Sequence, residues 1–461
     1  MNHKSNVLYL KNTEPFSSDS MPKTMAIRAS LLHFLEDPAK VTNPKHAFQY
    51  FEDGLLVVED GLIKDVKAFS DSDTTQYADI VDYRGKLIVP GFIDTHIHYP
   101  QTEMIASYGK QLLEWLENYT FPTEKQFEDK IHAKVISRFF INELLKNGTT
   151  SALVFGTVHP ESIDALFEEA LEKNMRIIAG KVMMDRNAPD YLLDTPESSY
   201  KDSKALIEKW HNHKRLQYAI TPRFAPTSSR EQLTAAGKLK AEFPDVYVQT
   251  HLSESKNEVE WVKSLFPEHE DYFSVYQHYG LAGARSVFAH AIHLTEREWN
   301  AFEDTDSVIS FCPTSNLFLG SGLFDLEKAE QKNVRVGLGT DVGAGTSFSQ
   351  FQTLNEAYKV MQLQDKKLSP FKGLYLATLG GAKSLSIDDK VGNFEIGKEA
   401  DFAVLDWAAT DLQHLRQQHA KSLEDKLFAL MILGDDRNVD ATYVDGKLVY
   451  SSTDHLVTTL A

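Results

Sequence analysis

Length and charge limit what this chain can be. Its 461 residues, 42% hydrophobic and 25% charged, suffice for one large barrel or two domains with a buried core. The 48 Lys and Arg residues against 66 Asp and Glu give a formal charge of −18, which makes nucleic acid and membrane surfaces poor partners because both are anionic.

The single cysteine and the first residues bear on compartment. Cys312 stands alone, which excludes an intramolecular disulfide and a zinc cluster built from cysteines, and fits a reducing compartment. Residues 1–24 are polar and are expected to form a flexible tail without a signal peptide. No apolar run approaches the roughly 20 residues that span a bilayer. We therefore expect a cytoplasmic protein.

Both ends of the chain are rich in predicted strands. Residues 25–87 alternate short apolar runs with turn signals, among them Asp60-Gly61 between two such runs. The same texture returns in residues 389–455, where Asp445-Gly446 is another expected hairpin turn. This pattern predicts that the two ends pair into one small β-sandwich domain.

The middle of the chain, residues 88–388, alternates strand-like runs with helical stretches such as Glu124–Lys146, Pro160–Asn174, Arg230–Phe243 and Leu294–Glu303. Eight strand-then-helix units predict an α/β fold of the (β/α)8 TIM-barrel type, and an open doubly wound sheet is the alternative. The expected strands are Ile88–His98, Thr150–Phe155, Arg176–Met184, Gln217–Phe224, Val246–His251, Ser286–Ala291, Val308–Cys312 and Val334–Asp341.

Several of these strands end in potential metal ligands. His96 and His98 stand two residues apart at the end of the first strand, so both imidazoles project to the same side. His251 ends the fifth strand, His290 the sixth and Asp341 the eighth. Because the carboxyl ends of barrel strands meet at the catalytic face, these side chains predict a site for Zn²⁺ or a similar divalent metal.

Two further positions suggest how that face works. Glu254 follows His251 by three residues and can face the same cavity as a proton carrier, although it could equally be the acidic first turn of a helix. The fourth strand ends at Arg223-Phe224 without a Lys, Glu or Cys that could bridge a second metal, and Lys181 lies on the third strand, so a single metal is favoured. Arg223 offers planar donors to a carbonyl oxygen; a surface salt bridge is its alternative role.

The motifs around these residues resemble those of the amidohydrolase superfamily. The shared features are Pro90–His98, Gly339–Asp341 and Gly397–Val404. Other stretches are similar to the guanine deaminase family in particular: Leu112–Pro122, Lys146–Thr150, Gly180–Asp185, Thr221–Phe224, His251–Glu254 and Cys312–Asn316.

The resemblance implies a reaction and a cofactor. It implies hydrolysis of guanine to xanthine and ammonia in purine catabolism, by a homodimer with one Zn²⁺ per subunit, and it leaves open whether iron replaces zinc in the cell. The metal ligands would be His96, His98, His251 and Asp341, with water completing the site.

The resemblance also implies the roles of the remaining residues. Glu254 would protonate ring N3 of guanine, Asp341 would accept a proton from the water, and His290 would orient that water. Arg223 would hold the 6-oxo group, and Gln101 would bond the purine edge. The substrate contacts implied are His98, Gln101, Arg223, Phe224, His251 and Asp341.

Rival functions remain open at this point. A related enzyme could act on another amino- or halo-heterocycle, such as 8-oxoguanine, a pterin or a triazine, although Arg223-Phe224 and Gln101 favour guanine. Base deaminases with two zinc-binding cysteines are excluded by the single cysteine. A metal-free scaffold would be expected to have lost ligands that are all present here.

Overall fold

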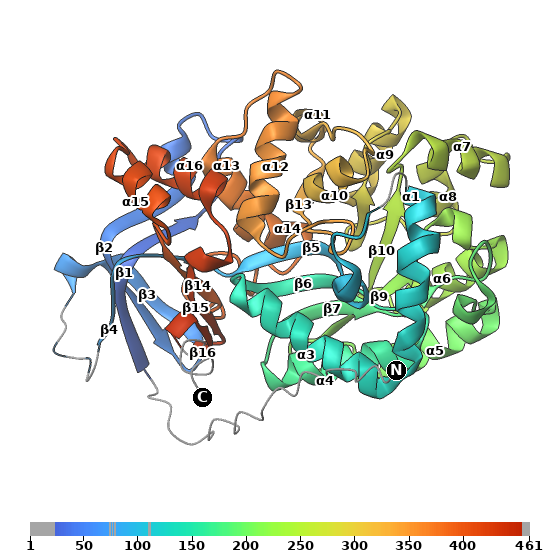
Figure 1. The fold of residues 1–461 in the computed structure, drawn as a ribbon, viewed down its shortest axis with the longest axis horizontal. Coiled ribbons are helices and arrows are strands. Elements are labelled where there is room, and N and C mark those ends of the chain that lie inside the picture. The colour runs from blue at the N-terminus through green and yellow to red at the C-terminus, as the bar shows by residue number, and fades with distance from the viewer. Residues whose placement is uncertain (1–23, 73–74, 76, 78–79, 109–111, 454–461) are drawn as a thin grey trace, which may run out of the picture.

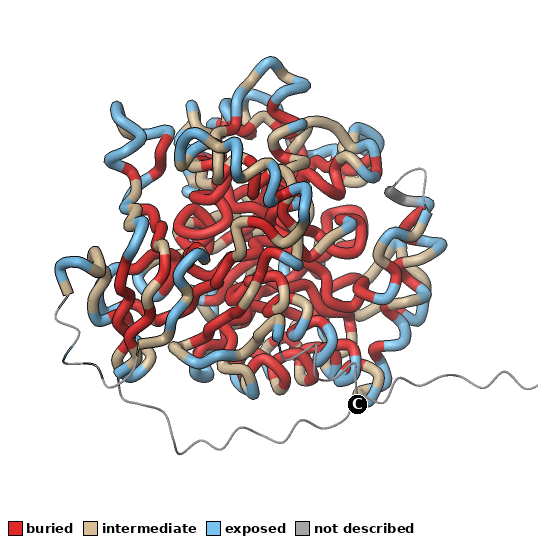
Figure 2. Tube along the Cα trace, turned by 60° about the vertical axis from the view of Figure 1, so that its left-hand side comes forward, coloured by how far each residue is buried: buried red, intermediate tan, exposed pale blue. Residues whose placement is uncertain are grey.

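The computed structural model describes residues 24–72, 75, 77, 80–108 and 112–453. Apart from Thr24, which begins the first strand, the expected tail lies outside these residues. A parallel barrel surrounded by helices occupies one side of the molecule, and a second sheet lies beside it (Figure 1). Buried residues gather in the interior of both parts (Figure 2).

The barrel confirms the predicted fold class. Its strands follow one another in the order of the chain, every pairing is parallel, and only β8 pairs off the main path, with β9. The strands are β5 (Phe92–His98), β6 (Thr149–Phe155), β7 (Arg176–Gly180), β8 (Val182–Met183), β9 (Gln217–Pro222), β10 (Tyr247–Leu252), β11 (Ser286–His290), β12 (Val308–Phe311) and β13 (Arg335–Leu338).

The first and last strands meet beyond the end of β13, which excludes the open sheet. The backbone N–H of Asp341 donates to the carbonyl of His96 at 2.9 Å, and that of His98 donates to the carbonyl of Val342 at 2.8 Å. The predicted strand Val334–Asp341 is therefore too long. Asp341 has φ of 52°, outside the strand region, and turns out of the ladder while staying bonded to β5.

Most of the described helices begin at a residue whose side chain caps them. Predicted helix Glu124–Lys146 is divided, because Asp129 accepts a hydrogen bond from the N–H of Ile131 and starts a new helix at Lys130. Thr295 likewise starts a helix at Glu296. The helices are α1 (Leu112–Trp115), α2 (Phe121–Glu124), α3 (Lys130–Lys146), α4 (Pro160–Glu172), α5 (Pro196–Trp210), α6 (Arg230–Glu242), α7 (Lys256–Leu265), α8 (Tyr272–His278), α9 (Glu296–Thr305), α10 (Pro313–Phe318), α11 (Leu326–Gln331), α12 (Gln350–Gln362), α13 (Pro370–Tyr375), α14 (Gly381–Ser384), α15 (Asp411–Gln418) and α16 (Leu423–Leu433).

The second sheet joins the two ends of the described chain, as predicted. It is one mixed sheet in the order β16-β15-β14-β4-β1-β2-β3, in which only β1 and β4 are parallel. Ile27, Leu56, Phe402 and Tyr443 pack into a shared core, so both halves of the sheet cover the same apolar cluster. The strands are β1 (Thr24–Phe34), β2 (Phe48–Glu59), β3 (Leu62–Ala68), β4 (Ile80–Pro90), β14 (Phe402–Asp406), β15 (Val439–Val444) and β16 (Lys447–Ser451).

Both expected hairpin turns are present. Asp60 and Gly61 have φ of 52° and 82°, and Asp445 and Gly446 have φ of 52° and 72°. Two consecutive positive φ values match the twist of the flanking strands, and Asp-Gly tolerates them well. The two turns meet over Ala400, whose N–H donates to the carbonyl of Gly61 at 2.7 Å and whose carbonyl accepts from Gly446 at 2.9 Å.

The predicted strand Ile88–His98 belongs to both sheets. Residues 88–90 end β4 and pair with β14, whereas β5 begins at Phe92 in the barrel. Gly91 is needed between them, because an added Cβ would lie 2.2 Å from Thr150 Oγ1. No helix in the described part of the chain is long and apolar enough to cross a membrane.

Buried ion pairs join the barrel to the second sheet. Arg215 donates to Asp401 at 2.6 Å and lies 2.7 Å from Glu399, and Arg176 donates to Glu399 at 2.6 Å. Arg215 also bonds the carbonyl of Asn174 at 2.8 Å. These arginines therefore tie the amino-terminal side of the barrel to the segment that leads into β14.

We expect Arg215→Ala to lower the thermal unfolding midpoint, because it leaves the buried Asp401 carboxylate unpaired; breaking a buried pair costs about 3–5 kcal/mol. Arg84→Ala is the control, since Arg84 pairs with Asp82 at the surface and its loss should change little. Circular dichroism melting compares them. Equal unfolding midpoints for the two variants would show that the buried Arg215–Asp401 pair does not stabilise the fold.

Candidate active site

Four potential metal ligands converge at the carboxyl end of the barrel. His98 Nε2 lies 3.2 Å from His96 Nε2 and 3.2 Å from His251 Nε2. Asp341 Oδ1 lies 3.2 Å from His96 Nε2 and 3.4 Å from His98 Nε2. Ligand atoms of all four lie within 4.8 Å of one another, so the strand-end residues do meet.

The chemistry of these donors fits a divalent cation. His251 Nδ1–H donates to the carbonyl of Arg223 at 2.7 Å, which leaves the lone pair of Nε2 facing the cluster. Burial lowers the pKa of His96, His98 and His251 below the usual histidine value, so the imidazoles are neutral. Neutral imidazoles and a carboxylate are the donors that zinc and similar metals prefer.

Asp341 stays ionised within this cluster. Burial alone would raise the pKa of its carboxyl, but the facing His96, His290 and His98 lower that pKa well below its ordinary value overall. The charge needed to balance a divalent cation is therefore present.

A buried carboxyl fixes the ligand backbone. Asp94 accepts hydrogen bonds from Thr340 Oγ1 at 2.5 Å and from the backbone N–H groups of His96 at 3.1 Å and Thr340 at 3.2 Å. Burial raises the pKa of Asp94 to about 7. Asp94 thus ties the strand that carries two ligands to the loop that carries Asp341.

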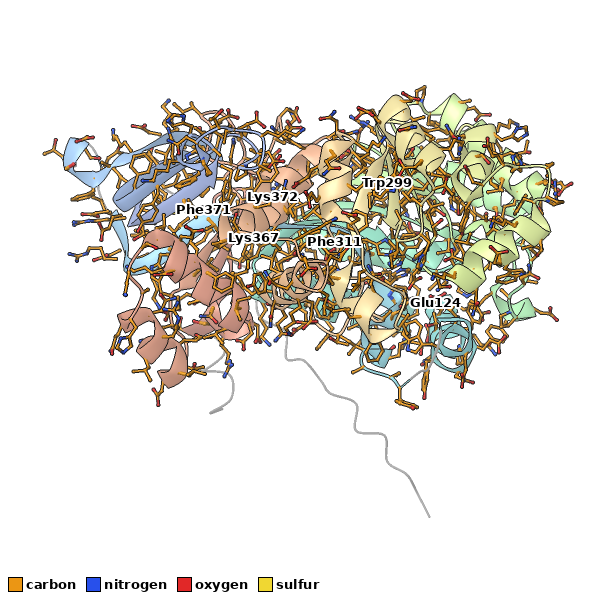
Figure 3. The ribbon with its side chains drawn as sticks, turned by 90° about the horizontal axis from the view of Figure 1, so that it is seen from above. Glu124, Trp299, Phe311, Lys367, Phe371 and Lys372 are labelled. Atoms are coloured by element: carbon orange, nitrogen blue, oxygen red, sulfur yellow. The ribbon has the colours of Figure 1, made fainter. Side chains whose placement is uncertain are left out.

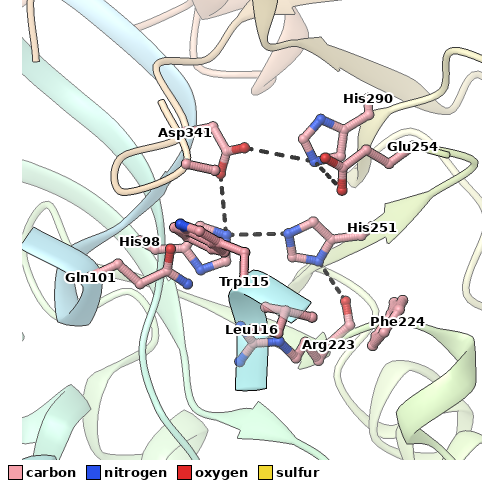
Figure 4. Close-up of a pocket in the computed structure, with 11 residues that line it drawn as sticks. His98, Gln101, Trp115, Leu116, Arg223, Phe224, His251, Glu254, His290 and Asp341 are labelled. Carbon is pink, nitrogen blue, oxygen red and sulfur yellow. Dashed lines mark hydrogen bonds and ion pairs between the residues drawn. The ribbon is translucent and has the colours of Figure 1, made fainter. Parts of the chain in front are cut away.

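His290 and Glu254 lie beside the ligands (Figure 4). His290 Nδ1–H donates to Asn316 Oδ1 at 2.8 Å, so Nε2 faces Glu254 Oε2 at 3.4 Å and Asp341 Oδ2 at 3.8 Å. Burial alone would lower the pKa of His290, but Glu254 and Asp341 raise it overall. Burial raises the pKa of Glu254 to about 7, and its Oε1 accepts from Ser321 at 3.1 Å. Both groups can exchange protons near neutral pH.

Glu254 is not part of a helical first turn, so that alternative is wrong. Ser255 caps α7, and the carboxyl of Glu258 accepts from the N–H groups of Glu254 at 2.8 Å and Ser255 at 3.1 Å. Tyr272 donates to the other oxygen of Glu258 at 2.8 Å. Glu258 thus completes the capping box with Ser255, which leaves the Glu254 side chain free to face the pocket.

A pocket that is partly open to solvent borders these groups, and its mixed polar and apolar lining suits a small molecule. Gln101 and Arg223 lie on the side opposite His290 and Glu254 (Figure 4). All the predicted substrate contacts line it. The lining residues are His98, Gln101, Trp115, Leu116, Arg223, Phe224, His251, Glu254, His290, Asp341 and Ala344.

Sequence reasoning missed the partner of Arg223. Arg223 is buried, and its Nη1 donates to Glu124 Oε1 at 3.0 Å and Oε2 at 2.8 Å, so it does not form a surface salt bridge. Gln101 Nε2 also donates to Glu124 Oε1, at 3.2 Å. The sequence signal was a carboxylate just after the Tyr119–Pro122 stretch, which is also where an acidic helix start is expected.

Two other groups compete poorly for a metal. Lys181, which the sequence analysis excluded as a bridge to a second metal, is buried, and its Nζ donates to Asp194 Oδ2 at 2.5 Å. A second cluster of potential metal ligands consists of His290, Cys312 and Asp341. Burial raises the pKa of the Cys312 thiol well above its usual value, which disfavours the thiolate that binds metals. The cluster of three histidines and Asp341 is therefore the better site.

The comparisons with known proteins identify a family for this chain. A profile of the Amidohydrolase family matches residues 87–449. Guanine deaminase of Escherichia coli (strain K12) is 60% identical over 431 residues, 92% of this chain and 97% of that protein. A structure of E. coli guanine deaminase matches with a TM-score of 0.90 and 59% identity, covering 93% of this chain and 100% of that one. A crystal structure of guanine deaminase from C. acetobutylicum with bound guanine in the active site matches with a TM-score of 0.85 and 33% identity. The match covers 93% of this chain and 100% of that one.

We expect the purified chain to contain a divalent metal and His251→Ala to lose most of it, because that variant lacks one of four ligands. Inductively coupled plasma mass spectrometry after gel filtration measures the content. His211→Ala is the matched control, since His211 pairs with Asp245 at 3.0 Å outside the cluster. Equal metal in both variants would place the ion elsewhere.

Proposed function

This chain belongs to the amidohydrolase family, and from that premise we propose that it hydrolyses guanine to xanthine and ammonia. The observation that carries the proposal is 60% identity, over 92% of the chain, to a guanine deaminase. A guanine-bound deaminase structure with a TM-score of 0.85 supports it. The acid–base groups and the pocket that they line supply the chemistry that this reaction requires.

The proposed cofactor is a zinc ion held by His96, His98, His251 and Asp341. Three imidazoles and a carboxylate form a typical zinc donor set, and their ligand atoms all lie within 4.8 Å of one another. Bound zinc supplies acidity to a water molecule, so that hydroxide becomes available near neutral pH.

The proton transfers are assigned to three side chains. Glu254, with a pKa of about 7, carries a proton that it can give to ring N3, which makes C2 more electrophilic. Asp341 accepts a proton from the attacking water, and His290, which faces both carboxyls, orients that water. Glu254, deprotonated by that transfer, takes the proton of the new hydroxyl at C2 and passes it to the departing amine, so that ammonia leaves and the 2-oxo group forms. The proton on Asp341 then returns to Glu254.

The opposite side of the pocket recognises the purine. Arg223 donates to the 6-oxo group, Gln101 bonds the purine edge and Phe224 packs against the ring. His98, His251 and Asp341 contact the substrate around C2. A site of matched donors rejects adenine, because its 6-amino group would leave buried donors unpaired.

The alternative substrate is another amino- or halo-heterocycle. The high identity of this chain to guanine deaminases favours guanine over that alternative. The homodimer and the cytoplasmic location stay predictions from the sequence.

The direct test of the proposed function is an ultraviolet and ammonia assay of the purified protein. We expect guanine to yield xanthine with an equal amount of ammonia, and expect chelation to abolish the reaction. Adenine, cytosine, 8-oxoguanine and melamine serve as parallel substrates. Turnover of one of these without turnover of guanine would contradict the assigned substrate.

We expect Glu254→Gln to retain metal and to lower kcat by about 100- to 10,000-fold, because the variant cannot carry the proton. Steady-state assays and metal analysis measure the two effects. Glu260→Gln is the control, since Glu260 is exposed on α7 and pairs only with Lys263 among the described residues. Full activity in Glu254→Gln would remove Glu254 from the mechanism.

The pH dependence has a predicted sign. Because the pKa of Glu254 is raised to about 7, the group carries its proton below that pH and loses it above. We therefore expect kcat/KM to fall as the pH rises through about 7, and expect this limb to vanish in the residual activity of Glu254→Gln. An unchanged alkaline limb in that variant would assign the titration to another group.

A further inference from the structure

We propose that Glu124 is a positioning residue that sets the specificity of the pocket for an oxo-purine. The inference rests on the proposed function and extends it to a residue outside the pocket lining. Glu124 ends α2, in the barrel half of the molecule away from the second sheet (Figure 3). It touches both residues assigned to the purine edge and acts through them.

The contacts of Glu124 are unusually complete for a buried charge. Glu124, Arg223 and Gln101 are 1%, 3% and 2% exposed. The Glu124 carboxylate accepts three hydrogen bonds, at 2.8 and 3.0 Å from Arg223 and at 3.2 Å from Gln101. A buried ion pair contributes little stability compared with apolar packing, so its value here lies in fixing the position of its partners.

The pair leaves most of the Arg223 donors available. Both carboxylate oxygens bond the same nitrogen, Nη1, and these are the hydrogen bonds that the Arg223 side chain donates to the described residues. The ring of Phe121, three residues before Glu124, lies 5.6 Å from the guanidinium carbon. Arg223 is thus held in place from α2 while its free edge remains for a carbonyl oxygen.

Glu124 also fixes which way the Gln101 amide points. An ionised carboxylate only accepts hydrogen bonds, so the Nε2 end of Gln101 must face it. The opposite end, Oε1, accepts from the N–H of Gly343 at 3.2 Å. One N–H and one lone pair of the amide are left, which gives Gln101 a defined donor and acceptor for the substrate.

The first part of the test measures ligand binding by Glu124→Gln as inhibition constants. Hypoxanthine carries the 6-oxo group and its neighbouring N–H, and purine lacks both. We expect hypoxanthine to bind about 10- to 100-fold more weakly to the variant, the range for loss of a charge-assisted hydrogen bond, and purine to change less than about threefold. For guanine, KM should rise more than kcat falls.

Glu117→Gln is the matched control, because Glu117 is exposed in the segment just before α2. Glu124→Asp is the second variant: it keeps the charge and the fold, but its carboxylate is one methylene too short to reach both partners. We expect it to lose part of the preference for hypoxanthine. Metal content and melting curves show that each variant is folded.

The outcomes separate this inference from the proposed function. A wild-type protein that does not deaminate guanine contradicts the function itself. A wild-type protein that does so, combined with Glu124 variants that weaken both ligands equally or neither, overturns the role of Glu124. Selective loss of the oxo ligand in both variants supports it.

Discussion

Mutual repulsion between buried ligand atoms governs this site. Neutral imidazole nitrogens of His96, His98 and His251 face one another at close range beside the Asp341 carboxylate, and a cation between them relieves the repulsion. The ligands come from β5, from β10 and from the segment that follows β13, so the arrangement requires a closed barrel. The hydrogen bonds that join β5 to the segment after β13, together with Asp94, bring the two ends of the barrel to the distance that a metal needs.

The pocket separates two kinds of charge. On the metal side, one carboxyl is kept ionised by facing histidines while Glu254, buried with less compensation, has a pKa raised to about 7. On the opposite side the guanidinium of Arg223 is neutralised by Glu124. A neutral purine therefore meets proton-exchanging groups at one end and fixed, charge-balanced donors at the other, which suits substitution at one ring carbon.

The sequence predicted those features that follow from strand periodicity. His96, His98, His251 and His290 end apolar runs, and the rule that parallel strands end at one face brings them together. Arg223 was found as a donor at the end of the fourth strand, and the resemblance added Gln101 and assigned Arg223 to the 6-oxo group. Features set by pairs distant in the chain were not predictable: Glu124 meets Arg223 across 99 positions, and Gly91 divides a continuous apolar run between two sheets because Thr150 packs against it. Glu258, which completes the capping box of α7 and so leaves Glu254 free, is likewise held by a hydrogen bond from Tyr272.

The most direct test of this metal and purine site is a crystal structure of the purified protein with a bound purine product, with anomalous data collected at the zinc edge. We expect an anomalous peak between His96, His98, His251 and Asp341, with the 6-oxo group on Arg223 and C2 toward Glu254. A peak at another cluster, or a purine whose oxo group faces away from Arg223, would contradict it.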